Sequence, residues 1–348
     1  MLITTWEDLG HMAPPDRTRK GLRWSRESDG AVAVVIGALL TFIIVVTLVG
    51  TYVLWYVPSN GDQLDIQYLS NTENSFLRMQ DQVGNSTPFP GEFVTQNFML
   101  GVAGTPPFSG STDSAMGYSN DSSYRTALNY SLVVNVTYSH VNRSIVLNIN
   151  FNGTGLISLT TDTPFIPSMG FYYQNDVIAT EQEGTNYSQI LGNLPFSVAA
   201  NSSGLLLHAS EFSVSGNNTT VGGYGSSLLT MQFSKTNQSD FFKGENVTVS
   251  NQTGGFTSAI VDNMSLRSFN YSITSPLVSS WNTTLSSLYA GSGTSHGNES
   301  TGITWNFSKF NFSVFLKGHT LSISMHTGTP LKPYSVELNY FVLRLLQI

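Results

Sequence analysis

Six histidines are the residues in this sequence best suited to acid–base chemistry or metal binding: His11, His140, His208, His296, His319 and His326. No two of them stand in an HxH or HExxH spacing, the patterns that place two imidazoles on one metal ion. The sequence also has no cysteine, which excludes thiol nucleophiles, Cys-ligated zinc and disulfide bonds. We therefore expect no metal site.

One short motif fits a nucleophile pattern. Gly293-Thr294-Ser295-His296-Gly297 matches GxSxG, the serine elbow of α/β-hydrolases. An elbow needs a buried strand before the serine and a helix after it. Here a predicted helix precedes the motif and the polar segment 298–302 follows it, so we interpret the motif as part of a Gly/Ser-rich loop.

Paired carboxyl groups for glycoside hydrolysis meet in the fold rather than in the sequence. The acids available for such a pair are Asp162, Asp176, Glu181, Glu183 and Glu211. Nothing in the sequence selects two of them, and no glycine loop for phosphate follows a strand and opens a helix. The sequence therefore predicts no catalytic residue, no cofactor and a protein that is not an enzyme.

Asparagine is followed by Ser or Thr two positions later far more often than chance predicts. The chain has 28 Asn, and 81 of its 348 residues are Ser or Thr, so random placement gives about six or seven such motifs. These motifs accept N-linked glycans on exported proteins. We predict nineteen acceptor sites: Asn85, Asn120, Asn129, Asn135, Asn142, Asn152, Asn186, Asn201, Asn217, Asn218, Asn237, Asn246, Asn251, Asn263, Asn270, Asn282, Asn298, Asn306 and Asn311.

All nineteen motifs follow a long apolar segment, residues 31–57, which has no charged side chain. A helix of these 27 residues is about 40 Å long at ~1.5 Å per residue, more than the ~30 Å hydrocarbon core of a bilayer. Trp55 and Tyr56 close the segment with side chains that favour the membrane–water interface. The sequence thus predicts one transmembrane helix in contact with membrane lipid.

The flanking charges predict its orientation. No basic residue follows the segment before Arg78. Five basic residues precede it: Arg17, Arg19, Lys20, Arg23 and Arg26. Positive residues gather on the cytoplasmic side, so we expect a single-pass protein of the cell membrane with its C-terminal domain at the cell surface. A secretory signal peptide has an apolar core of about 7 to 15 residues and a small-residue cleavage motif, which this segment does not fit.

The low content of charged residues limits the kinds of partner that the protein can bind. Only 11% of the residues are charged, and the formal net charge is −7. Nucleic-acid binding requires a basic face, so we exclude a nucleic-acid partner. With few Asp and Glu to protonate, acid removes little folding stability, and this favours the hypothesis of an acidic habitat.

A charged segment and a glycine, Glu27-Ser28-Asp29-Gly30, stand directly before the apolar residues that begin at Ala31. This arrangement resembles the N-terminus of archaeal type IV pilins and pilin-like surface proteins. The resemblance implies a prepilin-type peptidase as a partner, with cleavage between Gly30 and Ala31. It also implies contact with other pilin-like subunits through the apolar helix.

The resemblance extends to residues 62–83, which are similar to the second half of the pilin helix. Pro58, Asn60 and Gly61 are expected to interrupt or kink the helix before these residues. The apolar residues of the segment recur at helical spacing: Ile66, Leu69, Phe76, Met79 and Val83. Bacterial pilins carry a glutamate at the fifth mature position, which here is Val35, and the C-terminal part is larger than a typical major pilin head. A filament subunit and a membrane-retained relative both stay open.

Beyond Ser123 the apolar residues alternate with polar ones, the period of a half-buried strand. The clearest case is a hairpin of residues 132–138 and 145–151 around a polar break at 140–144. Other strands are predicted at 156–159, 205–208, 228–233, 247–250, 303–307, 312–316, 321–325 and 336–342. Pro, Gly and Ser clusters in residues 84–123 predict irregular loops on the head.

One helix is predicted among the strands, with Ser275 as its N-cap, Pro276 at its first position, and Gly291 at its end. Its apolar face holds four residues: Leu277, Trp281, Leu285 and Leu288. The whole chain is then an α+β protein: a disordered cytoplasmic leader 1–30 that is cleaved, a transmembrane helix 31–57, a helical stalk 58–83 and a mainly antiparallel β-sandwich head 84–348.

Two function classes stay open. The first is a membrane-anchored, N-glycosylated structural or adhesive surface protein. The second is a membrane-tethered exoenzyme or carbohydrate-binding receptor, in which Tyr172, Tyr173 and Tyr187 stack on sugars. The missing catalytic motif favours the first class.

Overall fold

The computed structural model describes residues 18–85, 89–104, 110–138, 140–185, 187–201, 204–242, 244–250, 256–288, 294–296, 303–307, 310–325 and 333–348. The chain divides into two compact units, one ending at Ser59 and the other comprising Asn60–Ile348. The first unit is helical, and the second is rich in strands.

The first unit holds helix α1 (Thr18–Thr51), the π-helical segment η1 (Tyr52–Tyr56) and the start of helix α2 (Val57–Asn85). The described end of the leader, residues 18–30, is helical rather than disordered. Arg, Lys, Leu and Glu in this segment are good helix formers. Because an apolar helix already follows, residues 18–30 extend it without a new nucleus.

The expected interruption near Pro58 takes another form. Helix α2 runs through Pro58, Asn60 and Gly61, and the irregular geometry lies just before them, in η1. There the backbone N–H of Val57 donates to the carbonyl oxygen of Tyr52, five residues earlier. A proline ring clashes with the carbonyl four residues before it, and the wider π turn gives that ring room.

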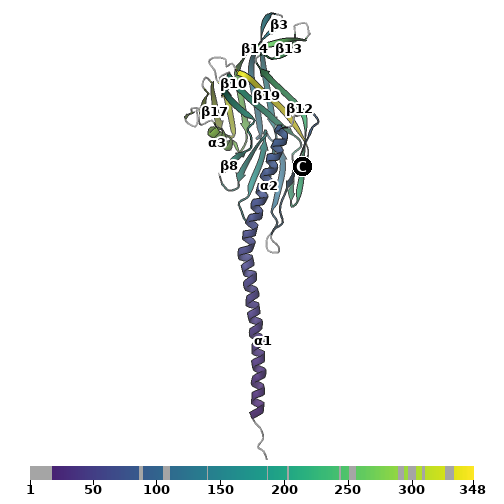
Figure 1. Cartoon of the computed structure of the whole chain (residues 1–348), viewed down its shortest axis with the longest axis vertical. Helices are drawn as coiled ribbons and strands as arrows, with labels where there is room; N and C mark the ends of the chain where they lie inside the picture. Colours follow the sequence, from purple (N-terminus) through teal and green to yellow (C-terminus); the bar gives the residue numbers. More distant parts are fainter. Residues whose placement is uncertain are drawn as a thin grey trace, which may run out of the picture. The chain divides into compact units, whose positions relative to one another are not determined.

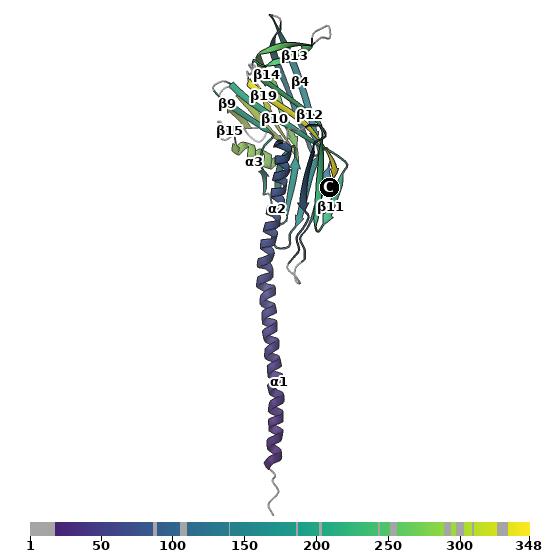
Figure 2. The ribbon, with the colours of Figure 1, turned by 45° about the vertical axis from the view of Figure 1, so that its right-hand side comes forward.

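The second unit contains the rest of α2, which lies among the strands in Figures 1 and 2. Phe76, Met79 and Val83 of the predicted stalk are buried in a core shared with the strands. Ile66 is different, since 58% of it is exposed and Tyr68 is buried in its place. From Asn60 onward, the expected stalk is therefore a helix of the strand-rich unit that packs one face against the strands and exposes the other.

Nineteen strands occur in the described residues, and their bounds are β1 (Phe93–Met99), β2 (Asp113–Ser119), β3 (Arg125–Tyr138), β4 (Val141–Thr154), β5 (Leu156–Asp162), β6 (Met169–Gln174), β7 (Val177–Gln182), β8 (Ser188–Leu191), β9 (Phe196–Asn201), β10 (Gly204–Ser215), β11 (Thr219–Gly223), β12 (Ser226–Phe242), β13 (Asn246–Ser250), β14 (Phe256–Thr274), β15 (Thr294–His296), β16 (Ile303–Phe307), β17 (Phe310–Lys317), β18 (Thr320–Met325) and β19 (Pro333–Gln347). A helix, α3 (Val278–Leu288), lies between β14 and β15.

The strands form three sheets. The five-stranded sheet has the order β1-β12-β19-β10-β9, and the six-stranded sheet has the order β11-β2-β5-β6-β7-β8. The eight-stranded sheet has the order β15-β16-β17-β18-β14-β3-β4, with β13 paired to β14. The described strand pairs are antiparallel except β10 and β19, which pair in parallel with His208 opposite Glu337.

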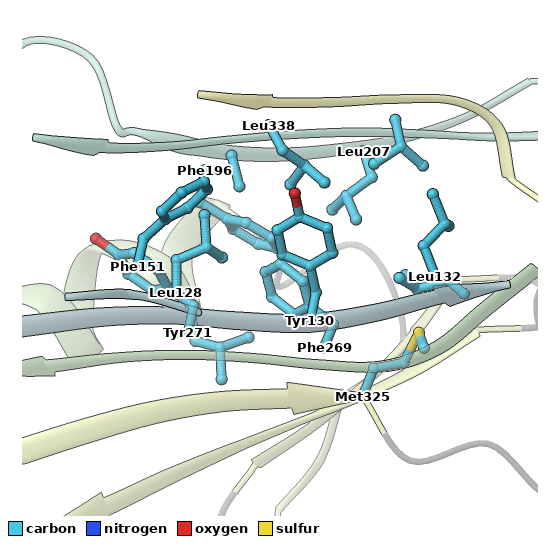
Figure 3. Packing of buried hydrophobic residues seen from close by; sticks show 14 of the residues in the cluster. Leu128, Tyr130, Leu132, Phe151, Phe196, Leu207, Phe269, Tyr271, Met325 and Leu338 are labelled. Atoms are coloured by element: carbon cyan, nitrogen blue, oxygen red, sulfur yellow. The ribbon is translucent and has the colours of Figure 1, made fainter. Parts of the chain in front are cut away.

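Two hydrophobic cores hold the sheets together. The first joins the eight-stranded sheet to the five-stranded one, with α3 at its side. Figure 3 shows Leu207 and Leu338 on one side of this core, facing Leu128, Tyr130 and Leu132 on the other. The second core joins the other face of the five-stranded sheet to the six-stranded sheet and α2.

The parallel pair β10 and β19 is therefore covered on both faces. Leu207 and Ala209 of β10 belong to the first core, and Phe212 and Val214 belong to the second. Such strands contain long apolar runs because both faces are buried. Polar side chains within them are consequently conspicuous, and β10 and β19 carry several.

The predicted hairpin 132–151 is confirmed as β3 and β4, although its polar break is shorter than expected. Val141 already pairs with Tyr138, and His140 at the tip has φ of 64°. The other predicted strands lie within β5, β10, β12, β13, β16, β17, β18 and β19. Segment 84–123, expected to be irregular, instead contributes β1 and β2.

The predicted helix after Ser275 is confirmed as α3, although it begins at Val278 and not at the predicted first position, Pro276. Its described end is Leu288. The Ser275 hydroxyl oxygen accepts a hydrogen bond from the Leu277 N–H at 3.2 Å, which caps the helix. Trp281 and Leu277 are buried as expected. Gly291, the predicted stop, lies outside the described residues.

Candidate functional site

The apolar segment of α1 is exposed along its described length. From Val32 to Val49 every side chain is exposed, with values of 72% for Val34 and 67% for Phe42. In a folded soluble protein, the apolar face of a helix is normally buried against other parts of the protein. Among the described residues, one helix is long enough and apolar enough to span a membrane, and it is this one.

Three threonines in this helix satisfy their own hydroxyl groups. Thr41, Thr47 and Thr51 donate to the carbonyl oxygens four residues earlier, at 2.9, 2.8 and 2.9 Å. A hydroxyl bonded inside its own helix needs no partner from water. Since the hydrocarbon core supplies no such partner, these bonds suit a helix surrounded by lipid.

Aromatic side chains mark the end of the apolar segment. The rings of Tyr52 and Tyr56 stack with centroids 5.0 Å apart, and 72% of Trp55 is exposed. Both residue types favour the membrane–water interface. Gly30 and Ala31, the expected cleavage residues, lie within α1, where the backbone is helical and the side chains are outside the described set.

The nineteen glycan acceptor sites can be sorted by exposure. Seven are exposed: Asn120, Asn142, Asn152, Asn217, Asn218, Asn237 and Asn246. Five are half-buried: Asn129, Asn135, Asn263, Asn270 and Asn282. The remaining seven, or their side chains, lie outside the described residues: Asn85, Asn186, Asn201, Asn251, Asn298, Asn306 and Asn311.

None of the twelve acceptors with a described side chain is buried. Among asparagines with a described side chain, the buried ones are Asn175 and Asn339, with exposures of 1% and 5%, and neither stands in an Asn-x-Ser/Thr motif. A glycan on either of these two would have to fit inside the fold. The described acceptors are therefore exposed or half-buried, and the seven exposed ones have space for a bulky, hydrated modification.

The histidines do not assemble a metal site among the described residues, where no group of three His, Asp or Glu side chains is placed to hold an ion. His11 and His326 lie outside this part of the chain. His140 is at a hairpin tip, and His319 follows β17.

The GxSxG motif differs from the expected loop. Residues Thr294–His296 form the short edge strand β15, paired to β16. Ser295 is thus in the middle of a strand, not at a strand-to-helix turn, which an elbow requires. Gly293 and Gly297 lie outside the described residues.

Several buried polar side chains in the strand-rich unit surround the tight turn between β6 and β7. The turn residues Asn175 and Asp176 have φ of 52° and 57°, the left-handed geometry of a two-residue hairpin turn that Asn and Asp tolerate. The Asn175 side chain accepts from the Phe212 N–H at 2.6 Å and donates to the Tyr271 hydroxyl. This turn is buried because the fold supplies its hydrogen-bond partners.

Helix α2 contacts the same turn. Gln80 donates to the carbonyl oxygens of Asp176 and Asn193, the latter at 3.0 Å, and accepts from the Asn193 N–H at 3.3 Å. The Asp176 carboxylate accepts from the Tyr173 hydroxyl at 3.0 Å. Burial raises the pKa of Asp176 to about 8, and the nearby Asp81 charge adds to the rise.

Glu211 of β10 is the second buried acid. Its exposure is 0%, and one carboxyl oxygen accepts from the Thr126 hydroxyl while the other has no hydrogen-bond partner. Burial raises the pKa of Glu211 to about 8. A Cβ at Gly153 would collide with this carboxyl group, so the glycine makes room for it. Asp176 and Glu211 both belong to the five acids considered for hydrolysis.

A cleft of about 440 Å³ lies beside the β6–β7 turn. Its polar lining includes residues of α2, the β6–β7 turn, β10 and β19: Gln80, Asp81, Asp176, His208, Ser210, Glu337 and Asn339. Its apolar lining includes Leu194, Pro195 and Phe341. A volume of this size is in the range of small-molecule sites.

Hydrogen bonds link the polar residues of β10 and β19 along one edge of the cleft. His208 Nδ1 lies 3.2 Å from a Glu337 carboxylate oxygen, and its Nε2 lies 3.4 Å from the Ser210 hydroxyl. The order Ser, His, carboxylate is that of a hydrolase triad. Acyl transfer also needs N–H donors for the oxyanion, yet the Ser210 N–H already donates to the Pro195 carbonyl at 2.7 Å. We therefore interpret the contacts from Ser210 through His208 to Glu337 as orienting the Glu337 side chain.

The tyrosines considered as sugar platforms have different surroundings. Tyr173 is fully buried, so its ring cannot stack on a ligand from solvent. Tyr172 is half-buried and lines a small cavity of about 140 Å³ with Tyr124 and Glu181. Tyr187 is 54% exposed, and its hydroxyl donates to Gln189 at 2.6 Å.

Sequence reasoning missed the cleft because its residues come from strands far apart in the chain. The available sign was polar residues within apolar strands, His208 and Ser210 in one and Glu337 and Asn339 in the other. A comparison with protein-family models, curated proteins and solved structures found no significant match for this chain.

Proposed function

We propose that this protein is a membrane-anchored, N-glycosylated surface protein of the archaeal pilin-like type, with a structural or adhesive role outside the cell. Its apolar helix lies in the membrane or packs against the helices of other pilin-like subunits. A prepilin-type peptidase removes the leader at Gly30. For the body, we infer that each hydrophobic core is a sandwich-type interface between facing sheets.

The exposure of the apolar side chains of α1 carries the proposal. Between Val32 and Val49 these side chains have no cover from the described protein, and water is an unfavourable environment for them. Burial in lipid or among other apolar helices removes that surface from water, at about 25 cal/mol per Å². The internally bonded threonines and the aromatic end support the same role.

Membrane fractionation tests the anchor. Ile44 of α1 and Ile66 of α2 are both 58% exposed, so they form a matched pair. A charged residue at the centre of a membrane helix costs about 2.5 to 3.5 kcal/mol. Ile44→Asp combined with Leu48→Asp is expected to move the protein out of the alkali-resistant membrane pellet. Ile66→Asp combined with Ser70→Asp, at two exposed positions of α2, should stay in the pellet, and equal behaviour of the two double variants would contradict the anchor.

A further inference from the structure

The cleft beside the β6–β7 turn has an excess of hydrogen-bond acceptors. Three acids on different elements line it: Asp81 on α2, Asp176 in the turn and Glu337 on β19. Among the described residues that line the cleft, none is Lys or Arg. A ligand that only donates hydrogen bonds and carries positive charge would complement this lining.

Asn339 adds an independent sign of a missing donor. Its side chain is 5% exposed and lines the cleft, and its Oδ1 atom has no hydrogen-bond partner. The amide orientation follows from Glu337, because the Asn339 Nδ2 atom donates to that carboxylate at 3.1 Å. Buried polar atoms are nearly always bonded, so Oδ1 lacks a donor that a ligand could supply.

The position of Glu337 is also defined by its neighbours. One carboxylate oxygen accepts from Asn339, and the other faces His208 Nδ1 at 3.2 Å. The side chain of Glu337 is nevertheless 45% exposed. A carboxylate oxygen has room for two hydrogen bonds, so Glu337 can accept another bond from the cleft.

We propose that this cleft binds a small organic ammonium ion, whose N–H groups donate to the Glu337 carboxylate and to Asn339 Oδ1. The Asp81 carboxylate provides a second negative charge in the cleft lining, which suits a ligand with two ammonium groups. Leu194, Pro195 and Phe341 provide an apolar wall for the alkyl chain between them. A monosaccharide fits less well, because its hydroxyls would need donors as well as acceptors.

Calorimetric titration of the full-length protein in detergent micelles tests this proposal. The probe is butane-1,4-diamine, and butane-1,4-diol is its uncharged counterpart. We expect the diamine to bind and the diol not to bind. Absence of diamine binding, equal binding of the diol, or binding of glucose in place of the diamine would each overturn the proposal.

Variants locate the binding. Glu337→Gln keeps the size of the side chain and removes its charge, so the diamine should bind about tenfold more weakly. Asp81 lies on the exposed side of α2, so Asp81→Asn should fold and should also weaken binding of the diamine. This variant tests the site if Glu337→Gln does not fold. Asp162→Asn removes an exposed charge outside the cleft and should leave binding unchanged. An equal loss in Asp162→Asn would show a non-specific charge effect and contradict the site.

Discussion

The side-chain amide of Gln80, on α2, donates a hydrogen bond to the backbone carbonyl oxygen of Asp176, at the tip of the β6–β7 hairpin. These residues are 96 positions apart in the sequence. The same side chain also bonds the backbone of Asn193 through both its nitrogen and its oxygen. Gln80 thus fastens the helix to two separate turns of the strand-rich unit.

Replacing Gln80 by Ala should lower the free energy of unfolding by about 2 to 4 kcal/mol, because the buried Asp176 carbonyl and the part-buried backbone bonds to Asn193 lose their partner. Urea denaturation of the full-length protein in micelles, followed by tryptophan fluorescence, measures the change. Gln96→Ala is the matched control, since Gln96 donates to an exposed carbonyl of Asn97, and we expect a change within about 0.5 kcal/mol. Equal losses in both variants would contradict this role for Gln80.

The two buried acids predict higher stability in acid than in alkali. Burial raises the pKa values of Asp176 and Glu211 from 3.8 and 4.5 to about 8 in the folded state. Their contribution to stability is therefore fully present below about pH 4 and is lost as the pH rises through about 8. The expected fall is on the order of 1 kcal/mol per pH unit for each of the two acids between about pH 5 and pH 8, measured by urea unfolding at several pH values.

Glu211→Gln should flatten this pH profile, because the amide keeps the acceptor for Thr126 and cannot ionise. Asp162→Asn, at an exposed position, should leave the profile unchanged. A wild-type stability maximum near pH 8 would refute this account of the buried acids. Higher stability at low pH would also agree with the acidic habitat suggested by the low carboxylate content.

Glycan occupancy should follow exposure. Glycopeptide mass spectrometry on protein from the native host should find modification at the exposed acceptors and little at the half-buried ones. Asn237→Gln should therefore remove one glycan mass, and Asn270→Gln should remove none. Higher occupancy at the half-buried positions would show that modification precedes folding and that exposure does not select the sites.

Processing at the leader gives a simple mass prediction. If a prepilin-type peptidase acts between Gly30 and Ala31, the mature N-terminal peptide should begin at Ala31. Substituting Gly30 by Phe should block cleavage and leave the leader attached. A wild-type protein that keeps residues 1–30 would remove the peptidase from the account and leave an anchored surface protein.

The sequence predicted strands well where the alternation of apolar residues is unbroken. In β3, Leu132, Val134 and Val136 point to one core, and the hairpin was found. The longest strand, β14, was missed although it pairs with β3 along most of its length. Its register shifts twice, between Val261 and Asn263 and between Leu266 and Ser268, and each shift breaks the period of two.

The candidate cleft was beyond sequence reasoning for a topological reason. His208 and Glu337 face each other because β10 and β19 pair in parallel, and parallel partners are distant in the chain. Burial of Asp176 was equally hidden, since Asn-Asp at a hairpin turn ordinarily predicts exposure. The apolar helix was easier, because its composition alone predicts its length and its environment.

Protease accessibility on intact cells tests the central claim most directly. We expect added protease to digest the strand-rich unit Asn60–Ile348 while a membrane-retained fragment containing the apolar helix 31–57 survives. A known cytoplasmic protein should stay intact in the same sample. If the strand-rich unit is spared while known exterior proteins are digested, the protein does not face outward, and the account of an anchored surface protein is contradicted.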